Sequence, residues 1–333
     1  MEIALLILGG LVLLAAGGEL LVRGAVRVAE RLGVSPLLIG LTLVGFGTST
    51  PELVTSVQAA LVGSPGIAVG NVVGSNIANV LLILGLAALV SPVAVGSNAL
   101  RRDGALVVGV ALLLAVLAFV APIGRLVGLL FLAGLAGYIA YAWRQERSGA
   151  SAGHTAAFEK AEAFEGTRPG LHATAAPAAR VGAAGFLVPL ALALGGLALV
   201  VFGGRFLVDG AIGMARGLGV SETVIGLTIV AVGTSTPEFV TSLVAAIRRQ
   251  SDVALGNILG SNIYNVLGIL GVTGLIAPTA VPPEIARFDN LVMVAASGAL
   301  FLFAWTGMRI GRREGAALLA GYVLYVWWIW PTG

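Results

Sequence analysis

Long apolar stretches separated by short polar segments dominate the chain. They predict ten helical segments, near residues 3–22, 34–62, 67–90, 104–121, 125–143, 183–203, 219–247, 253–277, 291–308 and 315–330. A membrane-spanning helix needs about 20 consecutive apolar residues, whereas a membrane β-strand alternates in polarity over about ten residues. Because the runs are long and continuous, we expect an all-α polytopic membrane protein with ten transmembrane helices.

The composition supports a membrane environment. Of the 333 residues, 58% are hydrophobic and 11% are charged, whereas a soluble domain carries about 25% charged residues. There is no cysteine, which excludes disulfides and thiolate metal sites. The net charge of +3 is too small to indicate a nucleic-acid partner. We therefore expect the lipid bilayer as the main partner, and nothing in the sequence requires an oligomer.

The basic residues predict the orientation of the helices. One set of alternate loops contains 15 of the 19 lysine and arginine residues, and the other set contains four. Basic loops face the cytoplasm, so both termini are expected outside a cell membrane, either inner or plasma. The long loop at residues 144–182 is then cytoplasmic. We interpret it as a flexible linker rather than a regulatory metal site, because its carboxylates lack the spacing of a calcium loop.

The chain contains an internal repeat. Residues 17–85 align with residues 203–271 at a constant offset of 186, with 40 of 69 positions identical. The repeated blocks read GLTLVGFGTSTPELVTS at 40–56, GLTIVAVGTSTPEFVTS at 226–242, GNVVGSNIANVLLILG at 70–85 and GNILGSNIYNVLGILG at 256–271. Five helices in each repeat reverse the direction of the chain. We therefore expect two inverted repeats, residues 1–143 and 183–333, an arrangement typical of secondary transporters.

Two carboxylates lie in the middle of apolar segments. Glu52 and Glu238 occupy equivalent positions in the two repeats. Intramembrane carboxylates are costly and usually functional. Two that lie close together repel each other or one becomes protonated, and a bound cation removes this cost. Hydroxyl and amide side chains share their helical faces at spacings of about one turn. These candidate ligands are Thr48, Ser49, Ser75, Asn79, Thr234, Ser235, Ser261 and Asn265.

Backbone oxygens complete the candidate site. Pro51 and Pro237 lack an N–H group, so carbonyls about one turn earlier, near Gly45 and Ala231, are expected to be free to bind a cation. A set of oxygen ligands without histidine or cysteine suits Ca²⁺, Mg²⁺ or Na⁺ rather than Zn²⁺ or Cu²⁺. No catalytic residue is expected, because both histidines and the single lysine, Lys160, lie in the 144–182 loop, away from the serines. A hydrolase with paired carboxylates remains formally open.

The paired GTSTPE and GSNIxN blocks resemble the two alpha-repeats of the sodium/calcium exchanger family, prokaryotic type, within the calcium:cation antiporter superfamily. The resemblance implies an antiporter that exchanges Na⁺ for Ca²⁺ by alternating access and exports Ca²⁺, without a cofactor. It also implies that Glu52 and Glu238 are shared Ca²⁺ and Na⁺ ligands. The first and sixth helices would form a sliding outer pair. The remaining implied ligands are Thr48, Thr234, Ser49, Ser235, Ser75, Ser261, Asn79, Asn265, Gly45 and Ala231.

The second block departs from one family pattern. Family members often carry an aspartate at one of the positions of Asn79 and Asn265, as potassium-dependent members do, so potassium co-transport is not favoured. Proton/calcium exchangers usually show a GNAxE-type motif instead, so sodium coupling is favoured and proton coupling is the alternative. A cation channel with the glutamate pair as a selectivity element is an alternative of a different class.

Overall fold

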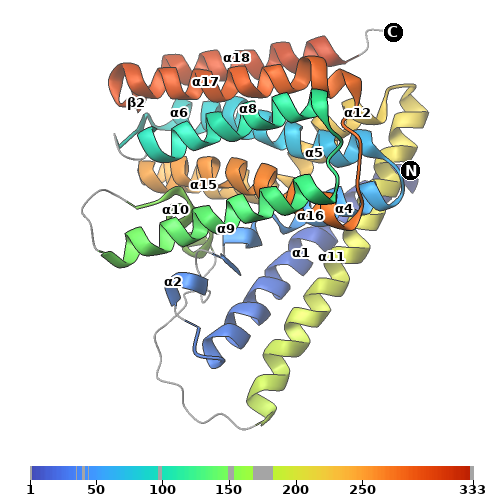
Figure 1. Ribbon diagram of the computed structural model, residues 1–333, viewed down its shortest axis with the longest axis vertical. Coiled ribbons are helices and arrows are strands. Elements are labelled where there is room, and N and C mark those ends of the chain that lie inside the picture. Colours follow the sequence, from blue (N-terminus) through green and yellow to red (C-terminus); the bar gives the residue numbers. More distant parts are fainter. Residues whose placement is uncertain are drawn as a thin grey trace.

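The computed structural model describes residues 2–34, 36–39, 42–43, 45–96, 100–148, 154–167 and 183–330. The structure is almost entirely helical, and helices overlie all ten predicted segments (Figure 1). The strands within the described ranges are β1 (Val93–Ala94) and β2 (Arg309–Ile310), which pair antiparallel with Val93 opposite Ile310. The fold is therefore all-α, as predicted.

The helices before the central loop are α1 (Glu2–Arg31), α2 (Pro36–Ile39), α3 (Gly45–Gly47), α4 (Thr50–Leu61), α5 (Pro65–Ala78), η2 (Asn79–Leu84), α6 (Gly85–Val90), η3 (Leu100–Gly104), α8 (Ala105–Val120) and α9 (Arg125–Ser148). The helix within the loop is α10 (Ala156–Thr167). The helices after it are α11 (Ala183–Leu218), α12 (Glu222–Ile225), η4 (Gly226–Val230), α13 (Ala231–Thr234), α14 (Thr236–Ile247), α15 (Ser251–Ile263), η5 (Tyr264–Ile269), α16 (Leu270–Ile276), η6 (Ile285–Asp289), α17 (Asn290–Gly307) and α18 (Arg312–Ile329). The η elements are π-helical turns that continue their neighbouring helices.

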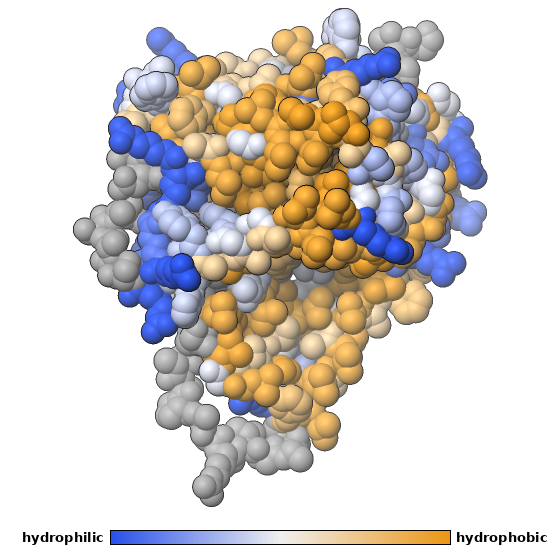
Figure 2. Space-filling model, viewed as in Figure 1, coloured by the Kyte–Doolittle hydropathy of each residue, from blue (hydrophilic) through white to orange (hydrophobic). Residues whose placement is uncertain are grey.

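Seven helices among the described residues are long and apolar enough to cross a membrane. An eighth span is obtained if residues 222–234 and 236–247, which meet at a bend of 51°, count as one. The chain is therefore a multi-pass membrane protein, and the figure of ten crossings stays a prediction. Figure 2 shows apolar side chains over much of the visible face, including its narrow lower end, where α1 and α11 lie in Figure 1.

Two spans form the centre of the bundle. Residues 65–90 and 251–276 are largely buried, whereas the spans of α1 and α11 are largely exposed. The central spans contain the second repeated sequence block of each half, including its polar residues. The polar residues of this second block are therefore shielded from lipid.

The helices α1 and α11 pack directly on each other through glycines. A Cβ atom on Gly17 would lie 2.7 Å from the backbone nitrogen of Val200, and one on Gly196 would lie 2.3 Å from that of Leu21. The contacting glycines recur every seven residues and match at the offset of 186, as small residues do in closely packed membrane helices. They are Gly10, Gly17 and Gly24 in α1 and Gly196, Gly203 and Gly210 in α11. The pairing of these two helices is confirmed.

Both helices are longer than predicted. The prediction ended the first helix near residue 22, but α1 continues to Arg31, and α11 continues to Leu218 instead of ending near residue 203. Arg23 ends the apolar run that predicts the first helix, but Arg23, Arg27 and Arg31 are spaced four apart and lie within the helix. A charge ends an apolar run without ending a helix.

The structure corrects the prediction for the central loop. A flexible linker was the favoured interpretation of residues 144–182, and this is wrong for residues 154–167 because α10 lies buried against α15. The side chain of Lys160 is fully buried. Residues 149–153 and 168–182 lie outside the described residues. In the part of the chain that the structure describes, no group of three or more histidine, cysteine or acidic residues could hold a metal ion.

Candidate cation site

The two broken helices position the central carboxylates. The helix α4 begins after Ser49 and α14 begins after Ser235, each with a proline within its first two residues. Proline lacks an N–H group and is tolerated best in the first turn of a helix, so each of these prolines favours a new helix start at this point. Glu52 and Glu238 consequently lie in the first turns of α4 and α14, where the helix dipole favours an anion. Each of these glutamates is 1% exposed.

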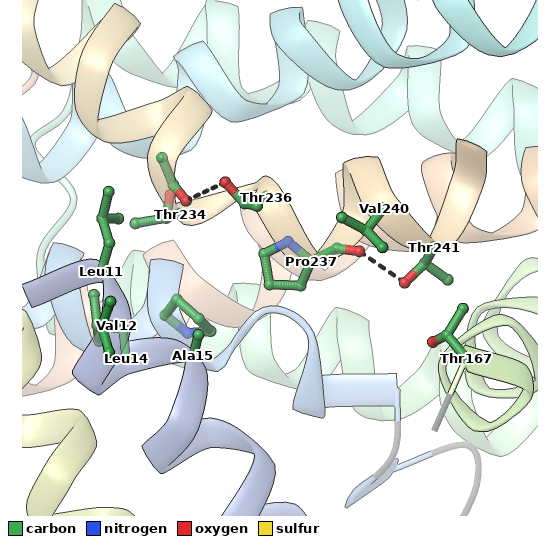
Figure 3. Close-up of a pocket in the computed structure, with 12 residues that line it drawn as sticks. Leu11, Val12, Leu14, Ala15, Thr167, Thr234, Thr236, Pro237, Val240 and Thr241 are labelled. Carbon is green, nitrogen blue, oxygen red and sulfur yellow. Dashed lines mark hydrogen bonds between the residues drawn. The ribbon is translucent and has the colours of Figure 1, made fainter. Parts of the chain in front are cut away.

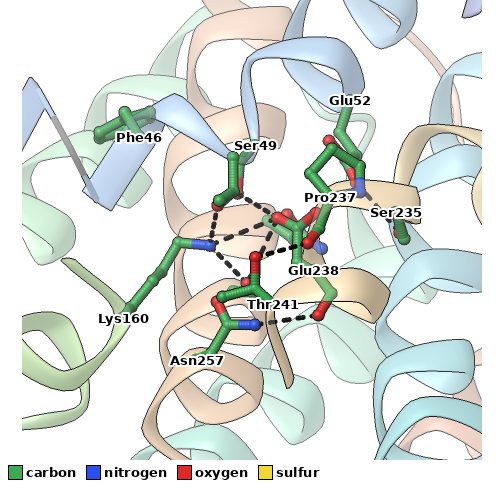
Figure 4. Close-up of polar contacts among 12 residues, drawn as sticks. Phe46, Ser49, Glu52, Lys160, Ser235, Pro237, Glu238, Thr241 and Asn257 are labelled. Atoms are coloured by element: carbon green, nitrogen blue, oxygen red, sulfur yellow. Dashed lines mark hydrogen bonds and ion pairs between the residues drawn. The ribbon is translucent and has the colours of Figure 1, made fainter. Parts of the chain in front are cut away.

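Each carboxylate contacts the other half of the chain (Figure 4). The hydroxyl of Ser235 donates to Oε1 of Glu52 at 3.0 Å, and the hydroxyl of Ser49 donates to Oε1 of Glu238 at 3.4 Å. We call the points just before α4 and α14 the two breaks. The serine at each break therefore contacts the glutamate at the other break. The site is complete only where the two breaks meet.

The central helices α5 and α15 add serines and amides. Ser75 lies 3.0 Å from the hydroxyl of Ser235 and donates to the backbone carbonyl of Ala231 at 3.4 Å. Ser261 donates to Oε1 of Glu238 at 3.5 Å. The carbonyl of Ala231, predicted as a backbone ligand, thus faces the polar cluster.

The amides of the two central helices cross-link them. Asn79 Nδ2 donates to Oδ1 of Asn262, and Asn265 Nδ2 donates to Oδ1 of Asn76, both at 3.0 Å. These bonds use the N–H groups of Asn79 and Asn265 and leave their oxygens free for another partner.

Four buried oxygens, two at the breaks and two on the central helices, have no hydrogen-bond donor among the described residues. They are Glu52 Oε2, Glu238 Oε2, Asn79 Oδ1 and Asn265 Oδ1. A buried acceptor without a donor costs about 1–3 kcal/mol, so four of them are unfavourable unless a cation neutralises them. Carboxylate and amide oxygens are the ligands of hard cations such as Ca²⁺ and Na⁺. The residues present therefore fit a hard cation.

A pair of asparagines binds the backbone at the two glutamates. Asn71 Nδ2 donates to the Glu52 carbonyl at 3.1 Å and to Ser56 Oγ at 2.9 Å. In the other half, Asn257 Nδ2 donates to the Glu238 carbonyl at 3.2 Å and to a hydroxyl of α14 at 2.8 Å. Such bonds fix the orientation of the ligands. These two asparagines are not among the residues predicted as ligands, although both follow the first glycine of the second repeated block.

Lys160 is the unexpected member of the site. Its Nζ atom donates to Thr48 Oγ1 and Ser261 Oγ, each at 2.5 Å, and lies 3.4 Å from Glu238 Oε1 (Figure 4). The expectation that this lysine lies out of reach of the serines is therefore wrong. Its helix reads AAFEKAEAFEGT, and the charges in that sequence resemble those of a solvated helix.

The structure buries all twelve residues predicted as ligands. They are Gly45, Thr48, Ser49, Glu52, Ser75, Asn79, Ala231, Thr234, Ser235, Glu238, Ser261 and Asn265. Beside them lies a cavity of about 480 Å³, whose lining includes Thr234, Pro51, Pro237 and Leu11 of α1 (Figure 3). The cavity connects the outer helix α1 with the second break.

The comparisons with known proteins agree with this geometry. The family model described as sodium/calcium exchanger protein matches residues 2–144 and 188–330. The chain belongs to the sodium/calcium exchanger family. The match omits residues 145–187, a stretch that includes α10.

Relatives within the sodium/calcium exchanger family cover almost the whole chain. The putative antiporter CaxA of Alkalimonas amylolytica is 38% identical over 96% of each chain. The sodium/calcium exchanger MaX1 of Methanosarcina acetivorans is 37% identical over 97% of each chain. A structure of the sodium-calcium exchanger NCX_Mj, soaked with 2.5 mM Na⁺ and 10 mM Sr²⁺, matches with a TM-score of 0.61 and 32% identity, and covers 98% of this chain and 99% of its own. These relatives are exchangers or antiporters, which supports the non-enzyme interpretation.

Proposed function

We propose that this protein is a secondary active antiporter that exchanges Na⁺ for Ca²⁺ and exports Ca²⁺ from the cell. The observation that carries the proposal is that four buried oxygens, of the two break glutamates and of two asparagines on the central helices, have no donors among the described residues. Two of these oxygens belong to carboxylates, whose combined charge of −2 matches one Ca²⁺ or a few Na⁺ ions. The names of the relatives MaX1 and NCX_Mj support this choice of cations.

In this proposal Glu52 and Glu238 bind Ca²⁺ and Na⁺ in turn, so the two cations exclude each other. The hydroxyl and amide residues complete the central Ca²⁺ site and the flanking Na⁺ sites. Gly45 and Ala231 contribute backbone carbonyls. If three Na⁺ ions exchange for one Ca²⁺, each cycle moves one net charge. The membrane potential then supplies about 2.3 kcal/mol per 100 mV.

The proposed mechanism is alternating access between two inverted five-helix repeats, residues 1–143 and 183–333. Ten crossings place both termini outside the inner or plasma membrane. The α1–α11 pair lies outside the central bundle, and the close glycine contact between its two helices holds them together so that they can move as one unit. We infer that this pair slides past the central helices to switch access.

The test is calcium transport by the purified protein in lipid vesicles. An outward-directed Na⁺ gradient should drive ⁴⁵Ca²⁺ uptake, and a collapsed gradient should abolish it. Glu52→Gln and Glu238→Gln should each remove uptake, because each substitution removes one of the two site charges. Glu2→Gln is the matched control, since this exposed glutamate lies in the first turn of α1. Retained exchange in both site variants would overturn the assignment of the site.

The same vesicles separate the alternatives. Uptake that follows a pH gradient and ignores Na⁺ would indicate a proton/calcium exchanger. Uptake that follows the Ca²⁺ gradient without any counter-ion would indicate a channel. Either outcome would refute Na⁺/Ca²⁺ exchange while leaving the position of the cation site intact.

A further inference from the structure

The helix α10 lies backbone to backbone against α15 (Figure 1). A Cβ atom on Gly256 would lie 2.1 Å from Cβ of Glu159, and one on Gly260 would lie 2.9 Å from the carbonyl oxygen of Ala156. Any larger side chain at these two positions of α15 would push α10 away. Gly256 and Gly260 therefore form a groove on α15 that α10 fills.

The repeat shows what an equivalent groove holds in the other half. Gly70 and Gly74 of α5 match Gly256 and Gly260 at the offset of 186. A Cβ atom on Gly74 would lie 2.3 Å from the carbonyl oxygen of Leu227, in η4, so the groove on α5 holds the first half of a broken helix. A Cβ atom on Gly70 would likewise lie 3.2 Å from the carbonyl oxygen of Thr223 in α12, so repeat symmetry assigns the groove on α15 to α2, the counterpart of α12. The helix α10 occupies that place.

The insertion of Lys160 also changes the hydrogen bonds of the site. In one half, the hydroxyl of Thr234 donates to Asn71 Oδ1 at 2.9 Å. In the other half, the equivalent hydroxyl of Thr48 accepts from Lys160, and the equivalent Asn257 Oδ1 is buried without a hydrogen-bond partner. Withdrawal of Lys160 would allow Thr48 to donate to Asn257, as its counterpart does. The same sequence therefore supports a second arrangement without α10 in the site.

Specific contacts anchor both ends of α10. At its N-terminus, the backbone N–H of Ala156 donates to Asp103 Oδ2 at 3.0 Å, and that of Ala157 donates to the Tyr138 hydroxyl at 3.2 Å. A carboxylate that accepts from the first N–H groups stabilises a helix. At the other end, Arg248 donates to the carbonyl of Gly166 at 3.2 Å. The position of α10 is thus fixed by polar contacts at both ends as well as by the groove.

We propose that α10 is an autoinhibitory plug, in which the ammonium group of Lys160 is a tethered cation that competes with the transported cation. The proposal rests on the proposed function. The ammonium group of Lys160 contacts oxygens of Thr48, Ser261 and Glu238. A metal ion bound to the same oxygens would prevent the ammonium group from binding there. Binding of the metal ion and docking of α10 oppose each other by the same factor in both directions. A rise in Ca²⁺ on the side of the loop then releases the plug and activates export.

The first experiment removes the tethered charge. In vesicles, Lys160→Met removes the ammonium group and keeps an unbranched side chain that is one atom shorter; it should lower the Ca²⁺ concentration for half-maximal exchange by about tenfold, within the usual range of 5–150-fold for coupled sites. Arg147→Met is the control, because it removes a positive charge from the exposed end of α9 without touching the site. An unchanged or higher Ca²⁺ requirement in Lys160→Met, with the protein still folded, would overturn the proposal.

The second experiment tests the position of α10 directly. The chain contains no cysteine, and Ala163 of α10 packs in one buried cluster with Ala254 of α15. A variant with both Ala163→Cys and Ala254→Cys should form a disulfide on oxidation, and this should reduce exchange by at least about tenfold. A reducing agent should restore exchange, and each single-cysteine variant should stay active. Full exchange by the cross-linked protein would show that Lys160 is a fixed part of the working site, which refutes the plug.

Cross-linking also separates the two proposals. Millimolar CaCl₂ should slow disulfide formation, because Ca²⁺ displaces Lys160 and releases α10. If no variant exchanges Ca²⁺, the proposed function fails, and the plug is then judged by this readout alone. Slower cross-linking in CaCl₂ than in choline chloride of equal ionic strength supports the plug. Equal rates in both salts refute it.

Discussion

An alanine at Gly17 tests the packing of the two outer helices. Its Cβ atom would lie 2.7 Å from the nitrogen of Val200, 2.8 Å from Cβ of Leu199 and 2.9 Å from the carbonyl of Gly196. Non-bonded carbon atoms prefer separations of about 3.5–4.0 Å, so α1 and α11 would have to separate by at least about 0.8 Å at this point. Two of the three contacts are with backbone atoms, which cannot move aside by changing a rotamer.

The neighbouring Gly18 provides the matched control. A Cβ atom on Gly18 would meet no atom of the described residues within 4 Å, apart from its chain neighbours and the backbone of its own helix. Both alanines gain the same helix propensity, up to about 1 kcal/mol over glycine. The difference between the two variants therefore isolates the steric cost, which is about 1–3 kcal/mol for an overpacked contact. Gly17→Ala should be the less stable variant by this amount.

The assay is thermal unfolding of both variants in the same detergent, followed by calcium exchange in vesicles. Gly17→Ala should unfold at a temperature several degrees below that of Gly18→Ala, and it should exchange Ca²⁺ more slowly if the pair slides. The adjacent glycines Gly196 and Gly195 repeat the test on α11, since only a Cβ atom on Gly196 would collide with α1. Equal melting temperatures within both pairs would refute the close α1–α11 contact.

Three further predictions concern the site and the plug. Asn71→Ala should cost about 1–3 kcal/mol of stability, because the carbonyl of Glu52 loses a buried donor; an unchanged melting temperature would show that this bond contributes nothing. Glu238→Gln leaves Lys160 without its nearest carboxylate, so it should destabilise the protein more than Glu52→Gln does, by up to about 3 kcal/mol. Addition of Lys160→Met should remove this difference in denaturation experiments, and a difference that persists would contradict the ion pair. Burial, aided by neighbouring carboxylates, raises the pKa of Glu159 to about 7. A carboxyl whose pKa is higher in the docked state favours docking when protonated, so docking should weaken as the pH rises from about 4.5 to 7. Glu159→Gln should consequently match the wild type at pH 5 and exchange Ca²⁺ more slowly at pH 8; equal rates at both pH values would exclude this effect.

The sequence alone predicts the helical segments and most of the site. Continuous apolar runs identify the helices, and Pro51 and Pro237 mark the breaks, because proline restricts the backbone whatever surrounds it. The constant offset of 186 pairs Glu52 with Glu238 and pairs each hydroxyl with its counterpart. These features could be read because each depends on residues within a few turns, or on the identity of two aligned segments.

Only the tertiary structure shows which groups use the oxygens of the site. Asn71 and Asn257 are visible in the repeat, but their bonds to the glutamate carbonyls depend on how α4 packs on α5 and how α14 packs on α15. Lys160 gave no sequence signal, because it lies 112 residues from Thr48 and 101 residues before Ser261. Its burial follows from a groove between two glycines of α15, which no property of its own segment indicates. Local sequence determines whether a charged helix can form, whereas the free energy of its burial depends on the partner that the fold brings to it.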